Sequence, residues 1–340
     1  MHHIGIDLGG KKSQICVRAA DSSIVAEFEA RTHHLAKALA DFPKSRVILE
    51  TCAEAFSVAR LLQDEGHDVR IVPATLVRQL GVGHRGVKTD KRDAQALSQV
   101  SCRIEVASVH LPSIRSREIR AVLKLRDGLV KSRTQMVNSV RSWARERLID
   151  LPKGTPLGFP RKIRACLEEY PDGLPGCVER QLQVIELLNA QIKEADVEIE
   201  SLRQSHPVAS QLSKLFGVGG IAALYFVSML DTQERFSDVK AVYSYLGMTP
   251  REYSSADKRN KYGITKAGPA DVRRTLVQSA WVIWQKRPND PLAVWGQRIA
   301  ERRGRKVAIL AMARKLAGIM YAMWRDGSSY RPHLVTSLDT

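Results

Sequence analysis

The order of short apolar runs in the first hundred residues constrains the fold of this chain more than any other feature. Five runs of four to seven residues read as β-strands, bounded by glycine, proline or charged residues. One amphipathic segment, 53–63, has helical periodicity and ends before Gly66. The strand runs are residues 4–8, 13–18, 23–29, 46–49 and 68–72. Three strands followed by helix, strand, helix and strand predict a mixed α/β sheet domain.

Downstream of this region the sequence changes to long helical patterns. Residues 113–148 read as one continuous and strongly basic helix, and a stretch rich in Pro and Gly follows at 152–160. From residue 212 the pattern is again helical, with one turn-rich loop. We therefore predict three parts: an α/β domain at 1–112, a basic helix and coiled-coil region at 113–205, and a helical domain at 206–340.

A seven-residue repeat runs through residues 178–202. Such a repeat predicts a coiled coil whose partner helix comes from the same chain or from another subunit. An ordinary amphipathic helix in a bundle fits the same pattern. The first apolar seam consists of Val178, Ile185, Ile192 and Ile199, and the second of Leu182, Leu188, Ala195 and Leu202.

The charge of the chain points to a polyanionic partner. The formal net charge is +17, from 53 Lys and Arg against 36 Asp and Glu. The excess is concentrated in two blocks, residues 78–147 and 258–306, each with a local charge of +10. A solvated surface can also carry such a run. Because two large basic blocks attract a polyanion, we predict that the chain binds nucleic acid.

The cysteines and the hydropathy exclude several other classes of protein. The five Cys residues are scattered without C-x-x-C spacing, which predicts neither a zinc site nor a disulfide framework and fits a cytoplasmic protein. The most apolar stretch, 219–230, is too short to span a bilayer. Arg314 and Lys315 interrupt the other apolar run, at 307–324. We therefore expect no membrane partner.

Four carboxylates stand where a metal-dependent nuclease would need them. Asp7 lies within the first apolar strand, and Glu50 ends the fourth. Asp90 and Asp93 are spaced i, i+3 at a predicted helix start. Above neighbouring strands the four could hold two Mg²⁺ ions, which clamp the attacking and leaving oxygens of a phosphodiester. Each also has an ordinary structural reading: Asp90 as a helix cap, Asp93 in the first turn interacting with the helix dipole, Glu50 in solvent, and Asp7 supporting the turn at 9–10.

Several stretches of the chain resemble a known family. The Ile-Asp-Leu-Gly run at 6–9, the strand-ending Glu50 and the segment Lys-Thr-Asp-Lys-Arg-Asp-Ala at 88–94 resemble the DEDD, RuvC-like domain of the IS110 family of bacterial insertion-sequence transposases, whose relatives include the Piv DNA invertase. Residues 245–255, 263–268 and 273–274 resemble the C-terminal transposase domain of the same family. The resemblance covers nearly the whole chain in the family's order. It implies a RuvC-like, ribonuclease-H-like fold for the first domain and DNA recombination as the activity.

The resemblance also implies roles for particular residues. The four carboxylates would be the metal-binding tetrad. The family's nucleophilic serine lies five residues after the proline of a Leu-Gly-x-x-Pro turn, which is Ser255 here. This chain has Ala256 where family members usually have Gly, so Ser254 is the other candidate. The serine would form a covalent phosphoserine link to DNA and would have to meet the carboxylate site, within one chain or from another subunit.

The partners follow in part from the family and in part from the charge. The family resemblance implies a non-coding guide RNA from the element itself, which pairs with target and donor DNA at the bacterial nucleoid. Strand exchange needs several strands cut in concert, so we expect a homo-oligomer, a dimer or a tetramer. We expect the following side chains to hold nucleic-acid phosphates: Arg117, Arg120, Lys124, Lys131, Arg133 and Arg141 in the first block, and Lys258, Arg259, Lys261, Lys266, Arg273 and Arg274 in the second.

Three other functions fit parts of the pattern. A metal-dependent nuclease of the Holliday-junction resolvase type would use the carboxylates without the serine, and it would cut without rejoining. A nucleic-acid-binding protein without catalysis would be unaffected by the loss of Asp7. An actin-like ATPase could begin with the same glycine-bounded strand at 4–10, but it needs a second copy of the fold, and residues 150–340 show none.

Overall fold

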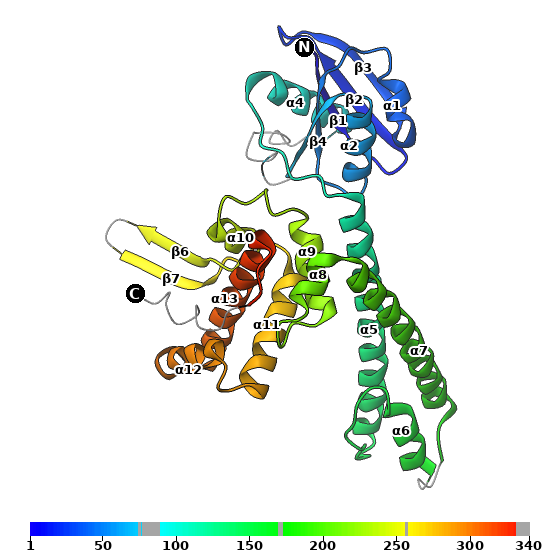
Figure 1. Ribbon diagram of the computed structural model, residues 1–340. Helices are drawn as coiled ribbons and strands as arrows, with labels where there is room; N and C mark the ends of the chain where they lie inside the picture. Colours follow the sequence, from blue (N-terminus) through cyan, green and yellow to red (C-terminus); the bar gives the residue numbers. More distant parts are fainter. Residues whose placement is uncertain (74–75, 77–88, 169–172, 256–257, 331–340) are drawn as a thin grey trace. The chain divides into compact units, whose positions relative to one another are not determined.

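The computed structural model describes residues 1–73, 76, 89–168, 173–255 and 258–330, and of residues 252–255 and 258–262 it describes the backbone alone (Figure 1). The chain divides into two units, Met1–Pro112 and Ser113–Thr340. The first unit is a mixed α/β sheet domain, and the second is mostly helical. This confirms the fold class predicted from the sequence at that level. Each unit is described separately below.

Five strands form the sheet of the first unit in the order β3-β2-β1-β4-β5. The pairs β1–β2 and β2–β3 are antiparallel, whereas β1–β4 and β4–β5 are parallel. The five strand runs read from the sequence therefore form one sheet, with ends that differ by at most two residues. The strands are β1 (His3–Asp7), β2 (Lys12–Arg18), β3 (Ile24–Arg31), β4 (Arg46–Glu50) and β5 (Asp68–Val72).

Helices cover both faces of this sheet. Val47 and Leu49 of β4 belong to the larger core, with the buried side chains of α1 and α2. Ile48, between them, points to the opposite face and packs with Leu97 of α4. All three β4 residues are completely buried, as expected of a strand that is covered on both sides. Among the described residues of this unit, the helical elements are η1 (Thr32–His34), α1 (Leu35–Ala38), α2 (Ala55–Asp64) and α4 (Asp90–Arg103).

The second unit contains a pair of long antiparallel helices, α5 (Ile114–Glu146) and α7 (Gly176–Ser205). They lie side by side, and α6 (Phe159–Glu168) packs at the end of the pair where α5 finishes (Figure 1). The seam with seven-residue spacing on α7 is buried, and α5 from the same chain is its partner helix. The second seam is less regular. Leu188, which the repeat places in this seam, is only half-buried, and its neighbour Asn189 is buried instead.

Six further helices form a bundle in the same unit. Its core is built around α9 and α13, most of whose residues are buried. Within the described residues, α13 is the one helix long and apolar enough to cross a membrane, and in this fold it packs inside the bundle through Met312, Leu316 and Met320. The helices are α8 (Pro207–Leu212), α9 (Gly220–Leu230), α10 (Val239–Tyr245), α11 (Ala270–Lys286), α12 (Pro291–Arg303) and α13 (Arg305–Asp326).

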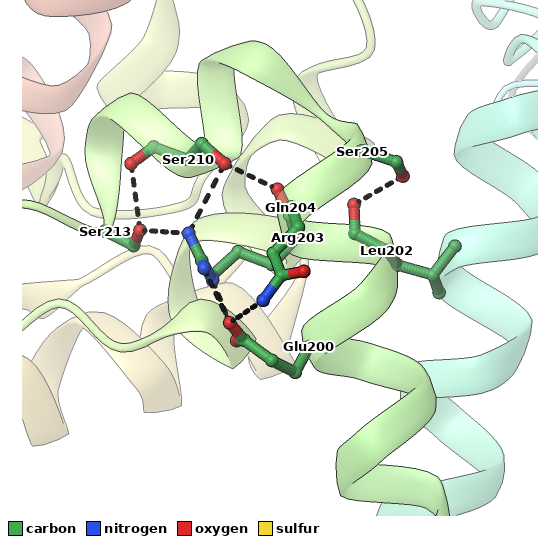
Figure 2. A network of polar contacts seen from close by, with 7 residues as sticks. All are labelled: Glu200, Leu202, Arg203, Gln204, Ser205, Ser210 and Ser213. Atoms are coloured by element: carbon green, nitrogen blue, oxygen red, sulfur yellow. Dashed lines mark hydrogen bonds and ion pairs between the residues drawn. The ribbon is translucent and has the colours of Figure 1, made fainter.

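A polar network around Arg203 joins the end of α7 to α8 (Figure 2). The guanidinium donates to both carboxylate oxygens of Glu200, at 2.8 and 2.6 Å, and to the hydroxyls of Ser210 and Ser213, at 3.3 and 3.2 Å. The hydrogen bonds that Glu200 accepts from Arg203, and after them the one from Gln204, lower its pKa to about 2. Gly220, at the start of α9, packs on the same arginine, since a Cβ there would lie 2.8 Å from Arg203 Cδ. The joint between the long helices and the bundle is thereby fixed.

The turn-rich segment expected after α10 is instead a β-hairpin. Strands β6 (Pro250–Ser255) and β7 (Lys258–Ile264) pair antiparallel, with an irregularity between Pro250 and Arg251. Tyr253 and Tyr262 are residues that favour strands, and the polar composition concealed this pattern. Within the described part of the second unit this hairpin is the whole of the β-structure, so that part holds no second copy of the five-stranded sheet.

Candidate active site and nucleic-acid interface

Two of the four predicted site carboxylates end neighbouring strands. Asp7 is the last residue of β1, and Glu50 is the last residue of β4. Because β1 and β4 are parallel, with Ile6 opposite Leu49, these carboxylates lie at the same edge of the sheet. Both are half-buried. The carboxyl ends of parallel strands are where open α/β sheets bind their ligands.

The other two carboxylates lie in the first turn of α4. Thr89 is the helix cap, because its hydroxyl accepts a hydrogen bond from the Arg92 amide at 3.3 Å. Asp90 is therefore the first helical residue and not the cap, and it is exposed. Asp93 is only 8% exposed. A carboxylate buried to this degree needs polar partners.

The helix α4 crosses β1 at very close range. A Cβ atom on Gly5 would lie 2.2 Å from the carbonyl oxygen of Ala94, so only glycine permits this approach. At the other end of the strand, the His3 ring nitrogen Nδ1 hydrogen-bonds the hydroxyl of Ser101 at 2.8 Å. The helix therefore runs antiparallel to β1, and its first turn lies toward the strand end that carries Asp7.

An ion pair holds this first turn against the sheet. The ammonium group of Lys91 lies 2.9 Å from the carboxylate of Glu27 on β3, and Gln95 of α4 donates to the same carboxylate. These hydrogen bonds hold the pKa of Glu27 below its usual range. The position of Asp90 and Asp93 is thus set by contacts to two strands of the sheet.

The chemistry of these side chains fits a divalent cation. Carboxylate oxygens are the donors that Mg²⁺ takes in proteins, and all four side chains come from elements that converge at one edge of the sheet. Within the residues that the structure describes, no three His, Cys, Asp or Glu side chains stand close enough to hold a metal ion as they are.

The two candidate serines lie at the end of β6. The backbone pairs Ser255 with Lys258 and Ser254 with Arg259, so both serines stand opposite basic residues of β7. Lys261 is on the same strand and pairs with Glu252. Ala256, the departure from the family pattern, lies outside the described residues.

Some of the predicted phosphate contacts on α5 are engaged by other residues of the fold, whereas others are exposed to solvent. Arg133 donates to the buried Asn189 side chain of α7 at 3.0 Å, and Arg120 donates to the Ser116 carbonyl. Burial lowers the pKa of Arg120, so this arginine is part of the packing between α5 and the bundle. Arg117 is half-buried, and Arg141 lies 5.4 Å from the centre of the Phe159 ring. Lys124 and Lys131 are exposed.

The predicted phosphate contacts near α11 also fall into residues with partners inside the fold and an exposed residue. Arg274 forms an ion pair with Asp127 of α5, which also accepts the hydroxyl hydrogen bond of the buried Tyr225 at 2.9 Å. Arg273 donates to the Leu246 carbonyl at 2.9 Å. Lys266 is exposed on the loop that follows β7. Arg273 and Arg274 thus have internal partners that an exposed phosphate contact would not need.

A cationic groove between α12 and α13 was not singled out from the sequence. It has a volume of about 630 Å³ and is lined by Arg302, Arg303, Arg314 and Lys315. Arg314 lies over the ring of Tyr243, 4.5 Å from its centre, and Lys315 lies 4.3 Å from the centre of the Trp295 ring. The basic block 258–306 contains Arg302 and Arg303 and so indicated part of the groove. Arg314 and Lys315 of α13 lie outside this block, and they join the other two only because α12 and α13 pack together in the folded chain.

Known proteins match both halves of the chain. A DEDD-type transposase model matches residues 4–146, and a model described as transposase IS116/IS110/IS902 family matches residues 209–293, so together they cover about two thirds of the chain. The transposase for insertion sequence element IS1111A of Coxiella burnetii is 25% identical, over 96% of this chain and 91% of its own. The transposase for insertion sequence element IS1328 of Yersinia enterocolitica is 27% identical, over 96% of this chain and 98% of its own. A probable family 20 transposase of Pseudomonas aeruginosa is 24% identical, over 98% and 99%.

Proposed function

Since this chain belongs to the IS110 family of insertion-sequence transposases, enzymes that cut and rejoin DNA, we propose that it exchanges DNA strands through a covalent phosphoserine intermediate at a magnesium-dependent, RuvC-like site. One observation carries the proposal. Asp7 and Glu50 end adjacent parallel strands, and the helix that bears Asp90 and Asp93 begins at the same edge of the sheet. The strand order β3-β2-β1-β4-β5 supports a ribonuclease-H-like fold for this unit.

The carboxylate set would hold the cations. A DEDD-type domain implies divalent-metal dependence, and we propose two Mg²⁺ ions held by Asp7, Glu50, Asp90 and Asp93. Bound there, the ions supply positive charge for the phosphoryl oxygens and for the attacking and leaving oxygens. Asp93 would act as a positioned ligand, because α4 is fixed on β1 by the close contact at Gly5.

The serine would provide the covalent step. The Ser255 oxygen attacks the phosphorus of a DNA phosphodiester, loses its proton and forms a phosphoserine ester. The bond from phosphorus to the sugar oxygen breaks, and that oxygen leaves as a hydroxyl. A sugar hydroxyl of another strand then attacks the phosphoserine, which rejoins DNA and frees the serine. The basic residues that pair with the two serines on β7 would balance the phosphoryl charge.

The partners in this proposal are DNA, an element-encoded guide RNA and further copies of the chain. DNA is the substrate that the family implies. Base pairing by the guide RNA would select the target, and the exposed cations of the second unit would hold the backbone through charge. A dimer or tetramer, acting in the cytoplasm of a bacterium, would cut the several strands together.

Trapping of a covalent protein–DNA adduct tests the chemistry. The protein is incubated with Mg²⁺, a junction-containing DNA and RNA transcribed from the flanks of the element, then denatured and run on a gel. We expect an adduct with the wild type and with Ser254→Ala, and none with Ser255→Ala. The Ser254 variant is the matched control, since it changes the same residue type one position away.

The second candidate function is a hydrolytic, structure-specific nuclease, favoured by the carboxylates alone. It predicts cleavage without an adduct and equal cleavage by Ser255→Ala. That result would exclude the serine mechanism while retaining the carboxylate site. An adduct that disappears in Ser254→Ala and persists in Ser255→Ala would identify Ser254 as the nucleophile.

A further inference from the structure

A strained and almost fully exposed leucine follows the long helix α5. Leu148 has a φ angle of 57°, in the left-handed region, and the residue is 95% exposed to solvent. Among the described residues, it is the one large apolar residue with positive φ. The other non-glycine residues in this region are Ser22, Asp231 and Lys266.

The helix end around Leu148 has the hydrogen bonds of a Schellman motif. The Leu148 amide donates to the Arg145 carbonyl at 3.1 Å, and the Ile149 amide donates to the Ala144 carbonyl at 3.0 Å. The residue in the position of Leu148 is usually glycine, because a Cβ atom is unfavourable in the left-handed conformation. The fold therefore does not need a leucine here, and the exposed side chain contributes little packing within this unit.

The surroundings of Leu148 are basic. A groove of about 460 Å³ beside it is lined by Arg141, Arg145, Lys153 and the backbone turn around Asp150, which is the one acidic residue of the lining. Residues 141–168, which form this end of the helix pair, contain seven Lys and Arg against three Asp and Glu. Of these cations, Arg164 is neutralised within the fold by Glu179 and Glu186. Arg145 and Lys153 are exposed.

We propose that Leu148 is a wedge that enters the minor groove of duplex DNA and unstacks a base step, while Arg145 and Lys153 hold the flanking phosphates. Apolar side chains at the tip of a rigid element, flanked by cations, distort DNA in this way. The charge of the tip complements a polyanion, whereas a second copy of this basic tip would not match it. Helix α5, with 33 residues, is about 50 Å long, and its pairing with α7 holds the tip rigid.

The proposal rests on DNA as the substrate and is independent of the serine chemistry. It assigns to the end of the helix pair a task that the reaction needs, because bases must be unpaired before a guide strand or an exchanged strand can pair with them. The exposed cations elsewhere would then provide affinity, and Leu148 would provide distortion.

Leu148→Gly separates the proposed role from any role in folding. Glycine relieves the backbone strain, so the melting temperature should rise by about 2 °C. The affinity for a duplex of about 30 base pairs should fall roughly tenfold at fixed salt, because the bent, unstacked complex is lost. A 2-aminopurine placed at a TA step of the duplex should become more fluorescent when the protein with Leu148 unstacks it. With Leu148→Gly this increase in fluorescence should disappear. All measurements use the full-length protein with Asp7→Asn, which prevents cleavage during the titration.

Two further variants serve as controls. Leu148→Met keeps a large apolar side chain and should retain the fluorescence gain. Leu125→Ala changes a leucine that is 72% exposed in the middle of α5, and should leave both affinity and fluorescence unchanged.

Three results would overturn the proposal. In the first, Leu148→Gly binds the duplex and raises the fluorescence as the wild type does. In the second, only binding of an A-form RNA duplex is weakened, which would make the tip an RNA contact. In the third, only the oligomeric state in sedimentation changes, which would make the tip a protein interface. An absent serine adduct together with Leu148-dependent unstacking would instead reject the serine mechanism and support the wedge.

Discussion

Gly5 of β1 and Ala94 of α4 are in backbone contact, since a Cβ atom on the glycine would lie 2.2 Å from the alanine carbonyl oxygen. This contact lets the helix lie directly on the strand that ends in Asp7. Asp93 immediately precedes Ala94, so the same contact fixes the buried carboxylate of the proposed metal site. A glycine in an apolar strand is therefore part of the architecture of the site, although it carries no functional group.

Gly5→Val tests this contact. We expect it to lower the free energy of unfolding of the first unit by about 2 kcal/mol or more, because backbone atoms of α4 would have to move away. Urea denaturation followed by circular dichroism measures the change. Gly10→Ala is the matched control, since a Cβ there meets nothing within 4 Å, and it should change stability by less than about 0.5 kcal/mol. Equal effects of the two variants would contradict the close-packing argument.

Asp7→Asn should reduce DNA cleavage by about a hundredfold or more, because a neutral amide is a poor ligand for a divalent cation. The melting temperature should change little, since the two side chains have nearly the same shape. Cleavage of a labelled DNA, measured across a Mg²⁺ titration and with a chelator, reports the effect. Asp41→Asn replaces an exposed aspartate before β4 and should cut DNA normally. Unchanged cleavage by Asp7→Asn would exclude Asp7 as a ligand that the reaction needs.

Lys131 and Arg133 on α5 should respond differently to truncation. Lys131→Ala should reduce the slope of log affinity for DNA against log salt concentration by about 0.9, because one exposed phosphate contact is lost. Arg133→Ala should instead lower stability by about 1–3 kcal/mol, since the buried Asn189 side chain loses a hydrogen bond. DNA titrations at several salt concentrations and urea denaturation distinguish the two effects. Lys193→Ala on α7, outside both basic blocks, should change neither quantity.

His206 should make the second unit sensitive to acid. Its ring nitrogen Nδ1 accepts the Ala209 amide as the cap of α8, and burial, followed by the charge of Arg115, lowers its pKa. The unfolded chain therefore binds the proton more readily than the folded chain. The stabilisation is complete above the ordinary histidine pKa of about 6.5 and is lost as the pH falls below it.

The variant His206→Asn checks this sensitivity. Asparagine is a good helix cap without a titrating group, so the loss of stability between about pH 6.5 and pH 5 should become smaller. Melting temperatures across this range measure it. His33→Asn, which changes an exposed histidine of the first unit, should leave the pH dependence as it is. A wild-type pH profile in His206→Asn would exclude His206 as the source.

The sequence predicted those parts of the fold that local patterns encode. The five strands, the helices at 53–63 and 113–148 and the buried seam through Ile185 are all present, because periods of two and of three and a half residues reflect which side of an element is buried. The hairpin at β6 and β7 was missed, since its polar residues read as a turn-rich loop. The identity of α5 as the partner of α7 was left open, because a seam shows that a partner exists and not which helix it is.

By residue type and spacing, the sequence alone singled out the four carboxylates and the two basic blocks as candidates. The two serine candidates came from the family resemblance that the sequence carries. Only the tertiary structure decided which cations are engaged within the fold: Arg133 with Asn189, 56 residues away, and Arg274 with Asp127, 147 residues away. It also showed that Leu148 is strained and exposed. The physical reason is that an arginine looks the same in the sequence whether a phosphate or a carboxylate neutralises it, and long-range packing makes that choice.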